Sequence, residues 1–588
     1  MGHGHLLRSN GAEPACHHGL NAYNQAVVPT FFSFRLSRAL RVVAGVGLTI
    51  VLAFSAMDCA RGQSPGDGAV TPSSTDRGRI LLVLPFDNRT GQPSLEWIRE
   101  AAAELLSSRF RSAGFDPMNR ADRLYALDHL GLPQGFQPSR ASSLKLAQTL
   151  DADSIVVGSY ITDGAAIVAE ARLVDVSHLR MSEAVTARGE MPNMIDVFDS
   201  LAWKLTRQLD PRFSVAEETF VAAGKGMRLD AFEQYIRGIT EPDQTERQRH
   251  LEQAVKLSPG FGPAWMALGR EDYKSQQYEQ AAAAFAKVDR NDADGLEAGY
   301  YRGLSFLFSG NYAGAEKAFA EVARILPLAE VVNNEGVAVS RQGHDGTDLF
   351  LQAAADDPNS ADYHFNLAVT LKRHAQVPGA LNELTQCLKL RPGDAEALAL
   401  QAAWQHPGAK PAAAPPGQTA ATGDASPDAD ATPDPLERIV RTFDAAAFRQ
   451  AAQMLDQVDA ARLGSLTPLE RAQQLSNQAK GFLNRGLLLE AERLYQSAVA
   501  DDGNCADAHA GLAQVRERTG DVASARMEAH QALELRASVD AYLVLGRLDL
   551  QANHLGEATN DTAAALKLEP ASQAALELSR QVQARAGH

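Results

Sequence analysis

The feature that most constrains the fold of this chain is a pattern of small and apolar residues that recurs about every 34 residues in its second half. Each copy places a small residue, then usually an alanine 12 residues later, then two further residues after 4 and 3 more. A fixed period of this length indicates repeated helical hairpins, which bury their apolar faces only by stacking on one another. Copies begin at Gly269, Gly303, Ala368, Ala479, Ala513 and Gly546, and a unit around Gly336 fits if two residues are deleted from its turn.

The spacing has a steric reason. A glycine or alanine in the first helix lets the second helix approach closely, opposite the alanine that follows 12 residues later. We expect the next residue of the pattern, such as Phe285 or Phe319, to pack against the following hairpin, and Pro327, Pro392 and Pro570 to end second helices. The copies resemble the tetratricopeptide repeat family. The resemblance implies an all-α, right-handed solenoid with a concave groove, and it says little about the ligand.

Length, charge and cysteine usage narrow the class of protein. A chain of 588 residues should divide into three or more units. Its net charge is −16, and no long Lys/Arg stripe is interleaved with aromatic residues, so nucleic-acid binding is not expected. Cys16, Cys59, Cys387 and Cys505 include no pair at the short spacing of a metal or redox motif. We predict no cofactor, no metal site and a buried structural thiol at Cys387.

The first 62 residues have the pattern of an export signal. Three arginines, Arg35, Arg38 and Arg41, precede the uncharged run 42–57, and Ala60-Arg61-Gly62 follows as a small-x-small triplet. Cleavage and retention as an N-terminal membrane anchor both remain open, because the run is somewhat short for a stable span. Lipidation of Cys59 is a weaker alternative, since Asp58 departs from the lipobox pattern. In each case we expect the rest of the chain to be exported, periplasmic or membrane-anchored facing the periplasm.

A small α/β domain is predicted for residues 78–212. The segment RILLVLPFDNRTG has the pattern of a buried strand, and a helix capped by Ser94 should follow it. Helices at 122–130 and about 139–150, the strand SIVVGSY, two extended segments that can form a hairpin around 177–180, and the amphipathic helix MIDVFDSLAWKLTRQL come next. This alternation predicts a small mixed sheet with helices packed on it.

Three motifs in this domain resemble a known family. They are 83–88 (VLPFDN), 152–159 (ADSIVVGS) and 171–175 (ARLVD). In this order they are similar to the TolB-like N-terminal domain that also occurs in FlgO and CsgG-type secretion proteins. The resemblance implies an assembly or protein-contact module of the cell envelope rather than a catalytic domain.

Composition sets the remaining boundaries. Residues 63–77 and 213–227 should be linkers, and 228–404 should form the first repeat array. Residues 405–434 are dense in Pro, Ala, Gly and Asp, so we expect a disordered linker there. The second array should occupy 435–588 and end in a capping helix, 572–584.

Candidate binding residues follow from the repeat pattern. In peptide-binding members of the repeat family, an asparagine two residues before the small residue clamps a peptide backbone, and Asn334, Asn366 and Asn477 have that place here. Arg341 and Arg373 come seven residues after the first two, on the same helical face. We predict that these residues bind an extended segment or a C-terminal carboxylate. The alternative is a solvated polar face.

Three functions fit these observations. The favoured one is a non-enzymatic protein-protein interaction scaffold of the bacterial cell envelope, which binds partner segments in the repeat grooves and uses the α/β domain as a second docking module. A ligand-sensing regulatory protein is the first alternative. An unrecognised enzyme is the second, although no nucleophile elbow or metal-ligand spacing occurs in the chain.

Overall fold

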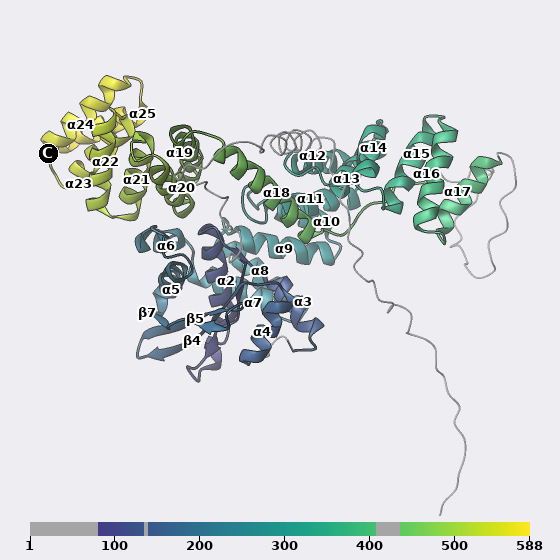
Figure 1. Cartoon of the computed structure of the whole chain (residues 1–588), viewed down its shortest axis with the longest axis horizontal. Coiled ribbons are helices and arrows are strands. Elements are labelled where there is room, and N and C mark those ends of the chain that lie inside the picture. The colour runs from purple at the N-terminus through teal and green to yellow at the C-terminus, as the bar shows by residue number, and fades with distance from the viewer. Residues whose placement is uncertain (1–79, 134–138, 407–434, 588) are drawn as a thin grey trace, which may run out of the picture. The chain divides into compact units, whose positions relative to one another are not determined.

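The computed structural model describes residues 80–133, 139–406 and 435–587 (Figure 1). The predicted signal or anchor, the linker at 63–77 and all but two residues of the linker at 405–434 lie outside these ranges. Within them, no helix is both long and apolar enough to cross a membrane. A small mixed sheet with helices is followed by a helical solenoid, so the predicted fold class is confirmed.

The sheet of the α/β domain is mixed, as its sequence predicts. Strand β1 runs parallel to its neighbours β3 and β4, whereas β5 is antiparallel to β4, β6 and β7. The long β4–β5 ladder turns at Gly164, whose positive φ of 63° suits a residue without a side chain. The strands are β1 (Ile80–Val83), β2 (Asp87–Asn88), β3 (Asp116–Pro117), β4 (Ser154–Asp163), β5 (Ala166–Asp175), β6 (Arg180–Met181) and β7 (Val185–Glu190).

Helices cover both faces of this sheet. Alternate residues of β1 point to opposite faces, so neighbouring residues of the strand pack against different helices. Leu81 and Val83 join one apolar cluster with α2 and α5, and Leu82 joins another with α3 and α4. The helical elements are η1 (Pro93–Leu95), α2 (Ile98–Ser112), α3 (Arg120–His129), α4 (Arg140–Thr149), η2 (Met191–Asn193), α5 (Met194–Leu209) and α6 (Glu217–Gly224).

The predicted cap at Ser94 is wrong. Ser94 lies in the short 3-10 turn η1, and α2 begins only at Ile98 without a side-chain cap. A proline at the start of η1 fixes the chain locally, so the hydroxyl does not meet the helix N-terminus. Ser139, by contrast, accepts a hydrogen bond from the backbone N–H of Ser142 at 3.2 Å.

Helical hairpins make up the rest of the described chain. In the first array the helices pair in sequence order and α17 ends the series. They are α7 (Leu229–Thr240), α8 (Gln244–Leu257), α9 (Gly262–Lys274), α10 (Tyr278–Phe285), α11 (Gly295–Phe308), α12 (Tyr312–Ala323), α13 (Ala329–Arg341), α14 (Thr347–Asp356), α15 (Ala361–Arg373), α16 (Val377–Leu390) and α17 (Ala395–Gln405).

The second array follows a long helix, α18, and ends with α25 as a cap. Its helices are α18 (Ala445–Gly464), α19 (Pro468–Asn484), α20 (Leu488–Asp501), α21 (Ala506–Thr519), α22 (Val522–Leu535), α23 (Val539–Gln551), α24 (Leu555–Leu568) and α25 (Gln573–Ala586). Phe448 of α18 belongs to the apolar cluster of the first array, although the sequence assigned residues from 435 onward to the second.

The small residues of the repeat pattern allow close approach, and the aromatic residue makes a contact that we did not expect in addition to the expected one. A Cβ added to Gly303 would lie 2.7 Å from the ring of Phe319 in the same hairpin, and one added to Gly269 would lie 2.7 Å from Phe285. The ring therefore covers the glycine of its own hairpin. Phe285 also stacks on Tyr301 of the next hairpin, with ring centroids 5.8 Å apart, so the expected contact is present as a second one.

Two histidines repeat one arrangement in the two arrays. His364 Nδ1 lies 2.6 Å from a carboxylate oxygen of Glu383, and its Nε2 lies 3.1 Å from the carbonyl oxygen of Pro358. His509 has the same two contacts, with Glu528 and Gly503. Both ring nitrogens face acceptors, so the imidazolium, which donates twice, fits best. The hydrogen bond to the glutamate raises the pKa of each histidine, with Asp357 adding to it at His364.

This arrangement predicts a pH-dependent stability. Because the folded pKa is raised, the stabilisation is complete below the unfolded-state pKa, about 6.5, and is lost as the pH rises through the folded value. We expect His364→Gln with His509→Gln to lower the free energy of unfolding by about 1 kcal/mol per site at pH 6, and by less at pH 9. Thermal unfolding across this pH range measures the difference in stability between the variant and the unaltered protein, with exposed His530→Gln as the control. A stability difference that does not change with pH would contradict the prediction.

Candidate functional site

Residues 435–443 form an extended segment that lies against the first helices of three successive hairpins, α11, α13 and α15. We call residues 435–443 the internal segment. We call the side chains of these helices that contact it the array-1 binding face. Of the five predicted binding residues, Asn334, Arg341, Asn366 and Arg373 belong to this face.

Two asparagines hold the backbone of the internal segment. The Asn366 amide nitrogen donates to the carbonyl oxygen of Arg438 at 2.8 Å, and its oxygen accepts from the Arg438 N–H at 2.6 Å. Asn334 makes the same pair of bonds with Val440, at 2.8 and 2.9 Å. Residues two apart in an extended chain face the same side, so one face of the segment meets both amides. Both asparagines are fully buried, where an amide without partners would be costly.

Neighbouring residues that the sequence analysis missed add to this hold. The Asn333 amide donates to the carbonyl oxygen of Arg438 at 3.2 Å, and the hydroxyl of Tyr300 donates to that of Val440 at 2.9 Å. Tyr300, Asn333 and Phe365 all stand three residues before the small residue of their repeat. That shared position was visible in the sequence, but the resemblance to peptide-binding repeats points only to the position two residues before the small one.

The two predicted arginines bind the start of the internal segment. Arg341 donates to the backbone carbonyl oxygen of Glu437 at 3.0 Å, and Arg373 donates to that of Pro435 at 2.9 Å. Arg373 and the hydroxyl of Ser340 also donate to the carboxylate of Glu437. The Glu437 side chain is only 1% exposed, and such a burial is tolerable because cationic and hydroxyl donors surround it.

The next residue, Arg438, enters an acidic and aromatic pocket. Its guanidinium carbon lies 3.6 Å from the ring centroid of Phe365. Its nitrogens donate to Asp394 at 2.6 and 2.9 Å, to Asp362 at 3.1 Å and to Glu396 at 3.0 Å. The hydrogen bond from Arg438 is the main cause that lowers the pKa of Asp394 to about 2. A forked, planar cation is what this pocket fits.

The far end of the internal segment is apolar. Ile439, Val440 and Phe443 pack against the apolar cluster of the first array. The Phe443 ring centroid lies 5.6 Å from that of Tyr300 and 4.2 Å from that of Phe448 on α18. The segment is therefore fixed at three levels: by its backbone, by two opposite charges and by an aromatic anchor.

Asn477, the fifth predicted residue, is not brought to this face. It lies exposed on α19 in the second array, in a shallow hollow that Leu466, Glu470 and three glutamines of the same region also line. Its role as a binding residue stays a prediction.

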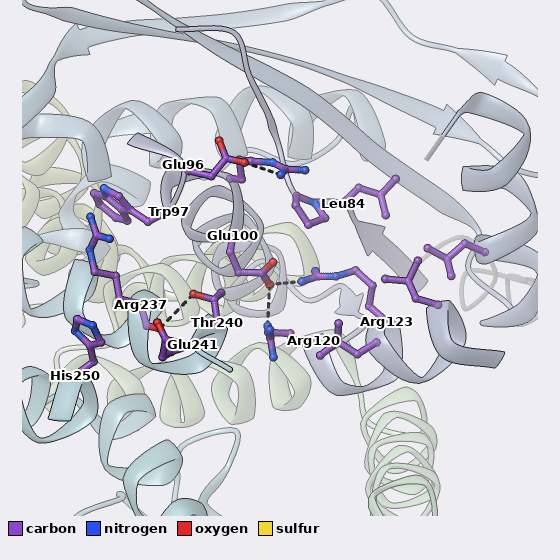
Figure 2. Close-up of a pocket in the computed structure, with 15 residues that line it drawn as sticks. Leu84, Glu96, Trp97, Glu100, Arg120, Arg123, Arg237, Thr240, Glu241 and His250 are labelled. Atoms are coloured by element: carbon purple, nitrogen blue, oxygen red, sulfur yellow. Dashed lines mark hydrogen bonds and ion pairs between the residues drawn. The ribbon is translucent and has the colours of Figure 1, made fainter. Parts of the chain in front are cut away.

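A separate pocket of about 390 Å³ lies between the α/β domain and helices α7 and α8 (Figure 2). Arginines and glutamates line it, and five of them pair with one another. Glu96 accepts from Arg99 at 2.7 Å. Glu100 lies 3.4 Å from Arg120 and pairs with Arg123, and dashed lines in Figure 2 mark these two contacts. Arg237 of the lining pairs with Glu233, which lies outside it.

One cluster in the described chain could hold a metal ion by distance, namely Asp549, His554 and Glu557. His554 and Glu557 are exposed, and Asp549 already accepts a hydrogen bond from Arg526 at 2.5 Å. We assign no metal site to it.

Comparisons with known proteins find solved structures that are similar to parts of this chain. No family model matches the chain, and no curated protein matches it. Among solved structures, MamA from Desulfovibrio magneticus RS-1 is 19% identical with a TM-score of 0.26 and covers 29% of this chain and 99% of its own. YrrB, described as a TPR protein with an unusual peptide-binding site, is 16% identical with a TM-score of 0.27 and covers 34% of this chain and 99% of its own. The LpoB C-terminal domain from Escherichia coli is 22% identical with a TM-score of 0.18 and covers 19% of this chain and 84% of its own.

Proposed function

We propose that this protein is a non-enzymatic scaffold that binds extended segments of other proteins through the array-1 binding face. The observation that carries the proposal is the pairing of Asn334 and Asn366 with both backbone groups of alternate residues in an extended chain. This mode of binding uses main-chain hydrogen bonds for affinity and flanking pockets for specificity. It needs no bond to be made or broken.

The cellular setting is part of the same proposal. The arginines and the uncharged run 42–57 in the sequence support export, so we place the scaffold in the cell envelope, in the periplasm or anchored facing it. The α/β domain would then be a second docking module for a different partner, in line with its resemblance to TolB-like domains. Fractionation of the tagged native protein tests the location, and a cytoplasmic result would overturn this part of the proposal.

Capture of partners by the tagged full-length protein tests the binding role. In a background in which Glu437→Ala with Arg438→Ala weakens the internal segment, we expect Asn366→Ala with Arg373→Ala to weaken retention of a partner about 30-fold or more, since several hydrogen bonds of about 1 kcal/mol each are lost. The matched control is Asn382→Ala with Arg324→Ala, which changes the same residue types at exposed positions on α16 and at the end of α12. Retention that is equal in both double variants would refute the assignment of the site.

A ligand-sensing role is the second candidate, because the pocket in Figure 2 is large enough for a small molecule and is lined by charged side chains. A reproducible rise in the unfolding temperature with one metabolite would favour it. Loss of that rise on Arg237→Ala, a residue that lines the pocket, would place the ligand there.

A further inference from the structure

The array-1 binding face is occupied by a segment of the same chain. We propose that the internal segment is an exchangeable placeholder, and that the partner of this face carries the same chemistry: an acidic residue, then arginine, two aliphatic residues and, three positions later, an aromatic residue. These features correspond to Glu437, Arg438, Ile439, Val440 and Phe443. The inference rests on the proposed function and adds to it the partner's motif and the competition for the site.

The way the backbone is held argues for exchange. A segment built permanently into a fold usually pairs its backbone with another backbone, in a sheet or a helix. Here the donors and acceptors for Arg438 and Val440 are side chains of Asn366, Asn334, Asn333 and Tyr300. They recur at fixed positions of successive repeats, so the face offers the same contacts to any extended chain of suitable sequence.

The side-chain pockets set the motif. Glu437 lies among Arg341, Arg373 and Ser340, so an acidic residue is required at this place. Arg438 enters the pocket of Phe365, Asp362, Asp394 and Glu396. A lysine would fit poorly there, because it lacks the planar fork that stacks on a ring and binds a carboxylate with two nitrogens.

Intramolecular occupation lowers the apparent affinity for a partner. A tethered segment is present at an effective concentration on the order of 1 mM. If the free segment binds with a Kd of about 10 µM, the open state is about 1% of the population and an external peptide binds roughly 100-fold more weakly than to an open face. Weakening the internal segment should therefore strengthen binding of an external one.

The test uses the full-length chain and a fluorescent synthetic peptide with the sequence of residues 434–446. We expect the peptide to bind Glu437→Ala with Arg438→Ala about 100-fold more tightly than it binds the unaltered protein. Adding Asn334→Ala and Asn366→Ala to that opened variant should abolish binding. Lysine in place of arginine in the peptide should weaken binding at least tenfold. Leu436→Ala, at a residue of the segment that is 62% exposed, is the control that should leave the unaltered behaviour.

Several outcomes would overturn the inference. Equal peptide binding by the opened variant and the unaltered protein would make the segment a fixed part of the fold. If the opened variant does not fold, hydrogen exchange of the unaltered protein decides: amides of Arg438 and Val440 that exchange no faster than those of α13 contradict exchange of the segment. A mass of two chains that falls to one on peptide addition would assign the segment to a second copy and contradict intramolecular occupation.

The failure of this inference is distinguishable from the failure of the proposed function. Loss of partner capture when Asn366→Ala and Arg373→Ala are added to the opened variant, with peptide binding equal in the opened variant and the unaltered protein, leaves the scaffold role and removes the placeholder. Peptide exchange with unchanged partner capture leaves the placeholder and removes the scaffold role at this face.

Discussion

Replacing Arg109 by methionine is expected to lower the local free energy of unfolding of the α/β domain by about 3–5 kcal/mol at pH 8. Arg109 on α2 and Asp199 on α5 join the two helices on one face of the sheet, with Nε–Oδ1 at 2.7 Å and Nη2–Oδ2 at 3.2 Å. Both side chains are buried, at 6% and 0% exposed. Without the guanidinium, an uncompensated carboxylate would stay in the apolar core.

The effect should depend on pH. Burial raises the pKa of Asp199 to about 6 even with Arg109 beside it. Because this folded value lies above the unfolded one, the carboxyl group stabilises the fold less as the pH rises from about 4 to 6. Loss of Arg109 raises the pKa further, so the variant should lose less stability at pH 5 than at pH 8, where the buried group must either stay charged or take up a proton.

Hydrogen exchange of α2 and α5 in the full-length protein measures the loss. The control is Arg188→Met, which breaks an ion pair with Asp163 that is 58% and 61% exposed, and it should cost less than about 1 kcal/mol. Adding Asp199→Leu to Arg109→Met should restore most of the stability, because no buried charge is then left. A double variant as unstable as the single one would show that packing, and not the charge, sets the effect.

Phe319→Ala should destabilise the first array by about 3–5 kcal/mol. The ring is fully buried on α12, covers Gly303 on α11 and meets Tyr300 edge-on, with centroids 5.7 Å apart. Its removal leaves a cavity that a neighbouring glycine cannot fill. Since Tyr300 donates to the backbone of Val440, amide exchange in the internal segment should accelerate together with that of α11 and α12.

The control for this change is Ile325→Ala in the turn after α12. Ile325 is 44% exposed, so its truncation should alter the free energy of unfolding by no more than about 0.5 kcal/mol. Equal protection of α11 and α12 in the Phe319 and Ile325 variants would refute the packing role of the ring. If amide exchange accelerates in α11 and α12 but not at Val440, the stability of the array does not determine how firmly the internal segment is bound.

The sequence was informative about the fold wherever the determining contacts are local. The spacing from Gly303 to Phe319 identifies a hairpin because both residues belong to the same pair of neighbouring helices. The apolar run at 80–83 predicts a strand that is buried on both faces, because the pattern lies within the strand itself. The cap of α2 was mispredicted because Pro93 starts a separate 3-10 turn. That choice depends on the chain's path over the sheet, which no short pattern encodes.

The candidate site shows the limit of pattern reasoning more sharply. Asn334 and Asn366 could be singled out by their repeat position, but their contacts with the internal segment join residues 106 and 72 positions apart. Residues 435–443 have no repeat pattern of their own, and they follow a stretch rich in Pro, Ala, Gly and Asp. Nothing local in such a segment reveals which distant surface its charges and its phenylalanine match.

The two adjacent charges of the internal segment also give the array-1 binding face a polarity. Glu437 is received on the side of Arg341 and Arg373, and Arg438 on the side of Asp394 and Glu396, one residue further along. A chain threaded in reverse would bring arginine toward arginine and glutamate toward carboxylates, although the asparagines could still bond its backbone. The face therefore distinguishes the two directions of a polypeptide, and it accepts a segment in a single orientation and register.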